Sequence, residues 1–144
     1  MNDARTDALT GTRLVAAGAA VATVAAGLGL RAVAAGNAAK YGGDALYTLL
    51  LVALVVLVAP RVSSRAAAGS ALALSWAVEF LQLSDVPAEL SARSTLARLV
   101  LGSTFNAPDL FWYVVGAAVG LLLHRAVDTV LSRRRPPHPV QQGG

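Results

Sequence analysis

The sequence contains no cysteine and only two histidines among its 144 residues. Without cysteine there are no disulfides, no thiolate chemistry and no cysteine metal sites. His124 lies at the end of an apolar run and His138 lies in a polar tail, which disfavours a histidine metal site. We therefore expect neither a metal nor a cofactor.

Charge is also scarce, since Asp, Glu, Lys and Arg make up 14% of the chain whereas hydrophobic residues make up 56%. This apolar share exceeds that of ordinary soluble domains and favours the lipid bilayer as the solvent. The net charge of +4 comes from arginines at the ends of apolar runs, a pattern typical of membrane flanks and not of a nucleic-acid surface. We expect membrane lipid, and no nucleic acid, as a partner.

Standard catalytic motifs are missing as well. The sequence has no phosphate-cradling glycine loop with lysine, no metal-spaced histidine pair and no nucleophile elbow. A carboxylate with an arginine can still act on a phosphate ester, so an enzyme stays an alternative with thin support.

Four apolar runs predict an all-α fold, a four-span transmembrane helical bundle. The runs are Leu14 to Leu30, Ala45 to Ala59, Ala66 to Leu83 and Leu110 to Leu123. A helix needs about 20 residues to cross roughly 30 Å of hydrocarbon, so the second and fourth runs must extend into Asp44 and Asp109. We interpret the first run as a retained span, because a signal peptide has a shorter apolar core.

The stretch from Pro87 to Leu101 has apolar residues near helical spacing, with Arg93 and Arg98 between them. This pattern predicts a short interfacial or re-entrant helix between spans three and four, ended by Gly102. The chain then divides into a polar N-terminal segment (residues 1–13), a transmembrane domain (14–131) and a disordered C-terminal tail (132–144).

Lys and Arg flank the runs unevenly. With four spans, eight of the twelve basic residues fall on the side of the two termini and four on the other side. This bias predicts that both termini are cytoplasmic in a bacterial cell membrane.

Polar side chains converge at the other membrane face. Asp44 and Asp109 precede the second and fourth runs, Glu79 and Gln82 end the third, and Arg93 lies in the following loop. The alternation of spans brings all of them to one side, which we predict to be a binding site together with Tyr113.

Glu79 is central to this prediction, because a charged side chain inside a span costs about 2.5 to 3.5 kcal/mol and needs a partner, a proton or an aqueous cavity. One interpretation is a structural carboxylate paired with Gln82 or an arginine. The other is a binding or catalytic group that faces an outward-opening cavity.

The other members have simpler interpretations too. Asp44 and Asp109 suit the N-cap position of a helix, and Tyr113 fits an interfacial aromatic belt. Arg93 or Arg98 can snorkel to the membrane surface, pair with Glu79 or bind an anionic headgroup. Gly116 and Gly120 form a small-xxx-small surface that predicts close helix approach and a possible homo-oligomer.

Several of these residues together resemble a known pattern. Tyr41-Gly-Gly-Asp44, Glu79-Phe-Leu-Gln82, Arg93-Ser-Thr95, and Asp109-Leu110 closing on Tyr113 and Gly116 resemble a membrane family of unknown function, domain of unknown function 2809, related to the VanZ-like proteins. The resemblance covers roughly Ala38 to Arg125.

VanZ-like proteins are associated with tolerance to glycopeptide antibiotics that act on the cell wall. Tyr113 stands where the broader VanZ-like pattern commonly has Asn, which favours the family of unknown function. The resemblance and the polar cluster together suggest a small membrane protein whose outward-facing site binds a cell-envelope lipid or lipid-linked precursor. The alternatives are an intramembrane enzyme on a polyprenyl-linked substrate, with Glu79 as acid or base and Arg93 holding phosphate, and a structural or assembly subunit.

Overall fold

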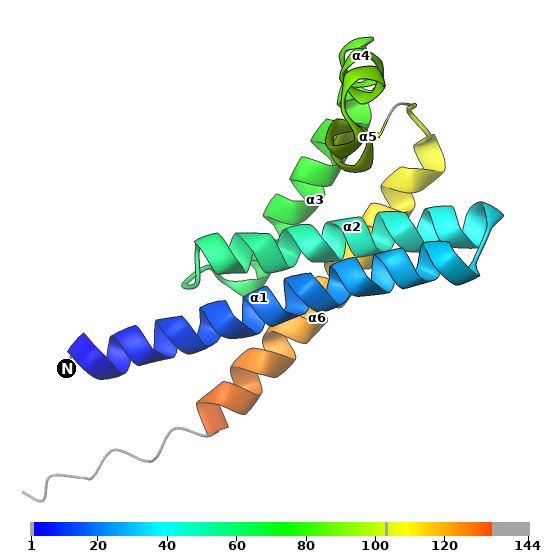
Figure 1. Cartoon of the computed structure of the whole chain (residues 1–144). Helices are drawn as coiled ribbons and strands as arrows, with labels where there is room; N and C mark the ends of the chain where they lie inside the picture. The colour runs from blue at the N-terminus through cyan, green and yellow to red at the C-terminus, as the bar shows by residue number, and fades with distance from the viewer. Residues whose placement is uncertain (1, 103, 134–144) are drawn as a thin grey trace, which may run out of the picture.

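Two long antiparallel helices form one side of the molecule. The computed structural model describes residues 2–102 and 104–133, and in it α1 (Asn2–Val33) and α2 (Gly36–Val58) pack against each other along their length. Figure 1 shows this hairpin with α6 (Ala107–Arg133) crossing behind it. The polar N-terminal segment predicted for residues 1–13 is therefore part of α1 from Asn2 on.

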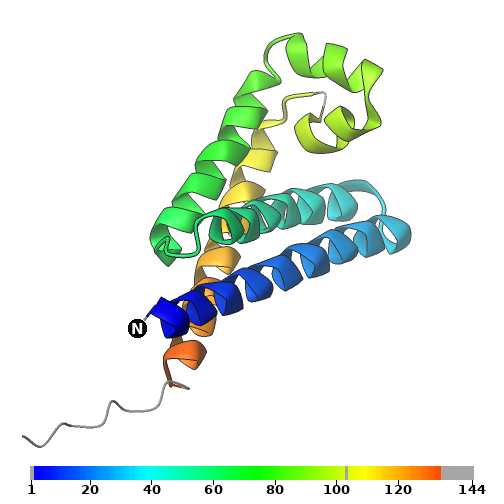
Figure 2. The same ribbon diagram turned by 60° about the vertical axis from the view of Figure 1, so that its left-hand side comes forward.

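The remaining helices extend from one end of the hairpin. α3 (Ser64–Leu81) packs on α2 and α6, then leads into α4 (Val86–Arg93) and α5 (Thr95–Leu101). Figures 1 and 2 place α4 and α5 next to the start of α6, whereas the start of α1 and the end of α6 lie at the opposite end of the molecule. All the described elements are helices, as predicted.

Three helical segments are long and apolar enough to cross a membrane: Arg5–Val33, Gly36–Val58 and Ala107–Arg133. α3 meets the same test only together with α4, and this pair is bent by 91°. The chain thus has three spans by length and composition, or up to four if the bent pair counts as one. These helices indicate a multi-pass membrane protein.

The α2–α6 contact depends on glycine. A Cβ added to Gly116 would lie 2.2 Å from the backbone oxygen of Ala45, and one added to Gly120 would lie 2.8 Å from Val52 Cγ2. The close helix approach expected from the small-xxx-small surface therefore occurs within the chain. α2 covers both glycines, and a homo-oligomer stays a prediction.

Small residues and one polar pair fill the centre of the bundle. Val52 and Val56 of α2 pack with Ala67 and Ala71 of α3. Beside them, the fully buried hydroxyls of Thr48 and Ser75 lie 2.7 Å apart, and Ser75 Oγ also donates to the Ala71 carbonyl. Each hydroxyl is satisfied inside the protein, as an apolar environment requires.

Three helix boundaries differ from the sequence-based prediction. α2 begins at Gly36, nine residues before Ala45, so Asp44 lies inside the helix and is not its N-cap. α6 begins at Ala107, which puts Asp109 in its first turn. α6 also continues to Arg133, and the predicted tail beyond that residue lies outside the described residues.

The single helix predicted for Pro87 to Leu101 is two helices. Ser94 has an extended backbone conformation, with φ −145° and ψ 123°, which ends α4. Its hydroxyl then accepts a hydrogen bond from the backbone N–H of Ala97, which caps α5. Serine is a preferred N-cap residue, so the signal for a break was present in the sequence.

Candidate functional site

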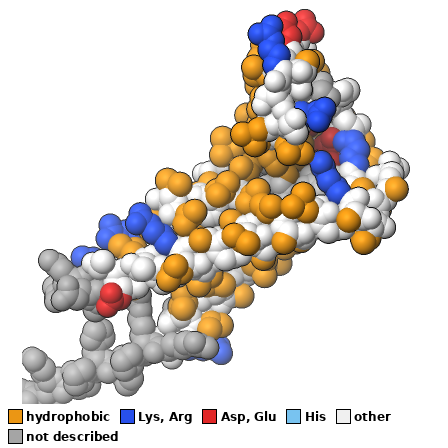
Figure 3. Space-filling view, viewed as in Figure 1, with side chains coloured by type: hydrophobic (Ala, Val, Ile, Leu, Met, Phe, Trp, Pro, Cys, Tyr) orange, Lys and Arg blue, Asp and Glu red, His pale blue; other side chains and the backbone are white. Residues whose placement is uncertain are grey.

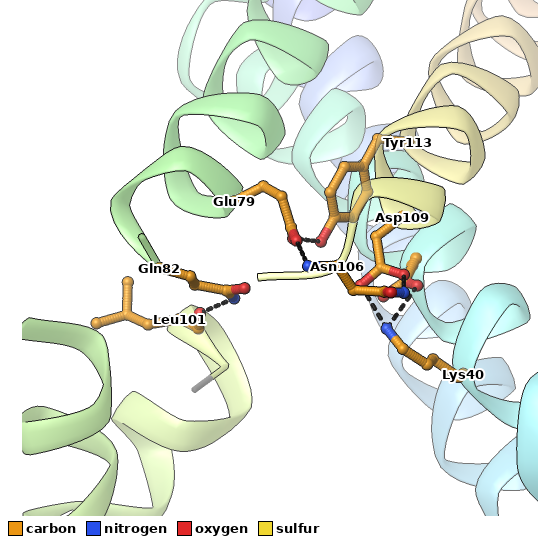
Figure 4. A network of polar contacts seen from close by, with 8 residues as sticks. Lys40, Glu79, Gln82, Leu101, Asn106, Asp109 and Tyr113 are labelled. Atoms are coloured by element: carbon orange, nitrogen blue, oxygen red, sulfur yellow. Dashed lines mark hydrogen bonds and ion pairs between the residues drawn. The ribbon is translucent and has the colours of Figure 1, made fainter. Parts of the chain in front are cut away.

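Glu79 is a fully buried carboxylate that connects α3 to α6. Its exposed fraction is 0%. Oε1 accepts a hydrogen bond from the backbone N–H of Asn106 at 2.5 Å, and Oε2 accepts one from the Tyr113 hydroxyl at 2.9 Å (Figure 4). Glu79 therefore holds the segment before α6 and the first turns of α6 against the end of α3.

A second carboxylate, that of Asp109, is bonded from two directions. Lys40 Nζ and Asn106 Nδ2 each donate to one of its oxygens, and only 5% of its side chain is exposed. Asn106 thus joins the two carboxylates, since its backbone N–H serves Glu79 and its side chain serves Asp109 (Figure 4). Lys40 also lies 3.8 Å from Asp44 Oδ2, one helical turn along α2.

Gln82 fixes the end of α5. Its Nε2 donates to the Leu101 carbonyl at 2.5 Å, and Ser91 Oγ donates to the Gly102 carbonyl at 2.7 Å. Gly102 has φ +64°, and a Cβ there would lie 2.6 Å from Gln82 Nε2. Glycine suits this turn because only a residue without a side chain adopts such a backbone freely and leaves room for the amide.

An open cleft of about 600 Å³ lies beside this network, between α1, α2, α5 and α6. Three basic side chains line it, Arg31, Lys40 and Arg98, together with the two acidic side chains of Asp44 and Asp109. In Figure 3 basic side chains gather where α5 lies over the α1–α2 hairpin, and apolar side chains cover most of the visible helices.

The charges in the cleft are unevenly matched. Lys40 lies between Asp44 and Asp109 and contacts both. Within residues 5–102 and 104–133, Arg31 and Arg98 have no carboxylate within ion-pair distance. Two arginines therefore line the cleft without an ion-pair partner among these residues. A guanidinium binds carboxylate or phosphate groups through paired N–H donors.

The cleft is also amphipathic. Its other wall residues include apolar side chains from four helices: Val24, Leu28, Leu50, Val78 and Leu99. A cavity with a few charged groups at one end and an apolar remainder suits a ligand that has both characters.

Comparison with known proteins identifies the family. The profile of a family described as "Protein of unknown function (DUF2809)" matches residues 33–117, which is more than half of the chain. The chain belongs to the DUF2809 family. No curated protein and no solved structure matches it.

The family match confirms the resemblance to domain of unknown function 2809. Its residue range runs from the end of α1 into α6 and includes the whole hydrogen-bond network of Glu79 and Asp109. Arg31 and most of α1 lie outside the range. The network thus belongs to the part of the chain that the DUF2809 profile describes.

The structure of this DUF2809 protein brings together five of the six predicted site residues. Asp44, Gln82, Asp109 and Tyr113 all line the cleft, and Glu79 is hydrogen-bonded to Tyr113 behind it. Tyr113 is 5% exposed, so the prediction of an interfacial belt position was wrong for this residue. A binding role for the five stays a prediction.

Arg93 is the sixth predicted residue, and it lies apart from the others. It is exposed at the end of α4 and does not line the cleft. In the part of the chain that the structure describes, neither Arg93 nor Gln82 is bonded to Glu79. The expected pairing partners of Glu79 were therefore wrong, because Tyr113 and the Asn106 backbone occupy both oxygens.

Lys40, Asn106 and Arg31 were missed as site residues. The i, i+4 spacing of Lys40 and Asp44 is typical of an ion pair on a helix, but the prediction placed Lys40 before the helix. Asn106 contributes through its backbone as well as its side chain, and a backbone contact leaves no signal in residue type. Arg31 reaches the cleft only because α1 folds back on α2.

Proposed function

We propose that this protein binds a phosphate-bearing lipid or lipid-linked precursor of the cell envelope in the cleft between α1, α2, α5 and α6. The observation that supports this function is a pair of arginines without an ion-pair partner among the described residues, Arg31 and Arg98, in a cleft with apolar walls. An anionic headgroup suits the basic end, and an apolar chain suits the remainder.

The residues behind the cleft have a positioning role in this proposal. Glu79 and Asn106 fix the start of α6, and Gln82 fixes the end of α5, the helix that carries Arg98. Lys40 is held by two carboxylates and adds no net positive charge beside the arginines. Two of the five charged side chains that line the cleft are acidic, so its net positive charge is small and non-specific binding of anions is limited.

The proposal includes a location. We place the protein in a bacterial cell membrane, related to the VanZ-like proteins, with both termini in the cytoplasm and the cleft at the outer surface. The excess of Lys and Arg on the side of the termini supports this orientation. The start of α1 and the end of α6 lie at the same end of the molecule (Figure 2), which supports an arrangement with both termini on one side of the membrane.

Binding of dodecyl phosphate to the purified protein in a non-ionic detergent tests the proposed function. We expect saturable binding that Arg31→Gln and Arg98→Gln each weaken by about tenfold, because a hydrogen bond to a charged group is worth about 1.5 to 3 kcal/mol. Dodecyl trimethylammonium should not compete.

Two control variants accompany this measurement. Arg61→Gln changes an exposed arginine between α2 and α3, outside the cleft, and Arg93→Gln changes one at the same end of the molecule that does not line it. Both should bind like the wild type. If the two cleft variants bind dodecyl phosphate as tightly as the controls, the proposed function is wrong and a structural role for the network is favoured.

A further inference from the structure

A second cavity of about 240 Å³ lies between α1, α2 and α6, and its walls are almost entirely apolar. It extends from Thr23 toward the start of α1, away from Arg31 and Arg98. The last residues that line it are Thr12, His124 and Asp128. Nothing in the proposed headgroup site uses this cavity.

The two cavities meet at Thr23, which lines both. Thr23 is 8% exposed, and its hydroxyl donates to the Ala19 carbonyl of its own helix at 2.7 Å. The hydroxyl is thereby turned away from ligands, so the junction offers an apolar surface. Thr12 is bonded in the same way to the Ala8 carbonyl.

One face of α1 runs along both cavities. The lining residues Thr12, Ala16, Ala19, Thr23, Gly27 and Arg31 follow one another at intervals of three or four. Residues at this spacing share one side of a helix. The cavities therefore adjoin along one face of α1, from Arg31 toward the start of the helix, and we call them together the groove along α1.

The groove is longer than one bilayer leaflet. From Arg31 to Thr12 there are nineteen residues, which at 1.5 Å per residue correspond to about 28 Å. The whole hydrocarbon core is roughly 30 Å thick, so a chain of an ordinary phospholipid reaches only about half as far. A chain that fills the groove must be longer than those of the surrounding lipid.

We infer that the groove along α1 holds one long apolar chain of a phosphate-bearing amphiphile, with the phosphate at Arg31 and Arg98 and the chain passing Thr23 toward His124. The ligand class is a phosphate with one long apolar chain, such as a polyprenyl phosphate, and not a diacyl phospholipid. This inference rests on the proposed function, because the phosphate site defines where the chain begins.

Chain-length dependence of binding tests this inference. The probes are geranyl phosphate, hexadecyl phosphate, a long-chain polyprenyl phosphate and a diacyl phosphatidic acid, each measured against the purified full-length protein in detergent. We expect polyprenyl phosphate to bind at least tenfold more tightly than geranyl phosphate, and phosphatidic acid to compete weakly.

Ala19→Leu narrows the apolar part of the groove without touching the basic end. Ala19 is an exposed residue that lines the second cavity, and Ala25→Leu is a matched control on an exposed position of α1 that lines neither cavity. Ala19→Leu should bind geranyl phosphate with wild-type affinity but should not bind polyprenyl phosphate more tightly than geranyl phosphate. Ala25→Leu should bind both probes with wild-type affinity. Equal thermal unfolding of the two variants excludes misfolding.

The outcomes separate the inference from the proposed function. If Arg98→Gln weakens every phosphate probe but Ala19→Leu binds polyprenyl phosphate like Ala25→Leu, the headgroup site stands and the groove is overturned. The groove is also overturned if phosphatidic acid binds as tightly as polyprenyl phosphate. If Arg98→Gln changes no probe, the proposed function fails first.

Discussion

At the scale of single residues, Glu79 illustrates how a carboxylate is kept inside an apolar bundle. Its two oxygens accept hydrogen bonds from a hydroxyl and a backbone N–H, and its exposed fraction is 0%. A buried carboxylate whose two oxygens both accept hydrogen bonds connects the segments that carry the donors. The sequence identified the residue, whereas its donors became known only from the structure.

Removing this carboxylate should destabilise the protein. Glu79→Ala leaves the Tyr113 hydroxyl and the Asn106 N–H buried without an acceptor, and each unsatisfied group costs about 1 to 3 kcal/mol. We expect the free energy of unfolding in detergent, measured by circular dichroism, to fall by about 3 kcal/mol. Glu79→Gln retains one acceptor and should lose less.

An exposed glutamate provides the control for this loss. Glu89→Ala removes a carboxylate from the first turn of α4, where solvent surrounds the side chain, and should change the free energy of unfolding by less than about 0.5 kcal/mol. Equal stability of Glu79→Ala and Glu89→Ala would contradict the proposed role of the Tyr113 and Asn106 contacts.

At the scale of helices, glycine determines how closely α2 and α6 approach. We expect Gly116→Ala to lower the free energy of unfolding by more than about 2 kcal/mol, because its Cβ would meet the Ala45 backbone at 2.2 Å and the two helices would have to separate. Thermal unfolding measures this difference.

Gly69→Ala is the matched substitution for that prediction. Gly69 lies in α3 and has no atom within 4 Å of an added Cβ. Alanine there should stabilise the helix by roughly 0.5 to 1 kcal/mol, since glycine is the poorer helix former. If Gly116→Ala and Gly69→Ala change the free energy of unfolding by similar amounts, the close contact of Gly116 with the Ala45 backbone does not determine stability.

The α4–α5 unit depends on few contacts with the rest of the chain. Gln82→Leu removes the hydrogen bond to the Leu101 carbonyl while keeping the size of the side chain. We expect faster hydrogen exchange over residues 95–101 and a change of at most about 1.5 kcal/mol in the free energy of global unfolding.

A second variant tests the same contact between Gln82 and the end of α5 by changing Gly102. Gly102→Ala forces a residue with a Cβ into φ +64°, at a cost of about 1 to 2 kcal/mol, and places that Cβ against Gln82. We expect this variant, too, to exchange amide hydrogens faster over residues 95–101. Unchanged exchange in both variants would mean that other contacts hold α5.

At the scale of the whole molecule, the bent pair α3 and α4 decides how many times the chain crosses the membrane. The protein has no cysteine, so single cysteines report accessibility without background. We expect Asp7→Cys and Ser132→Cys to react with an impermeant maleimide from one side of the membrane. Asn37→Cys and Ala92→Cys should react from the other side.

Ala92 is the informative position in this experiment, because it lies in α4 beyond the bend. If α3 and α4 return without crossing, Ala92→Cys reacts from the same side as Asp7→Cys, and Ser132→Cys reacts from the opposite side because α6 crosses the membrane between them. The α1–α2 hairpin would keep its orientation in either case, and Asn37→Cys provides that reference.

The sequence by itself determined that the lipid bilayer is the solvent of this protein, that the fold is helical, and at which end of the molecule the polar residues gather. Apolar length and helical spacing are local properties, and antiparallel alternation of long helices then places Asp44, Gln82 and Asp109 at one end. The family could also be recognised from short residue patterns, because those patterns lie within residues 33–117.

Only the tertiary structure decided which groups meet. Whether Glu79 contacts Tyr113 or Arg93 depends on how α3 and α6 are rotated about their axes and on where the segment before α6 passes. Sequence spacing carries neither quantity. The joining of Arg31 to Arg98 across one cleft has the same origin, since residues 67 positions apart meet only after α1 has folded onto α2 and α5 has folded over both.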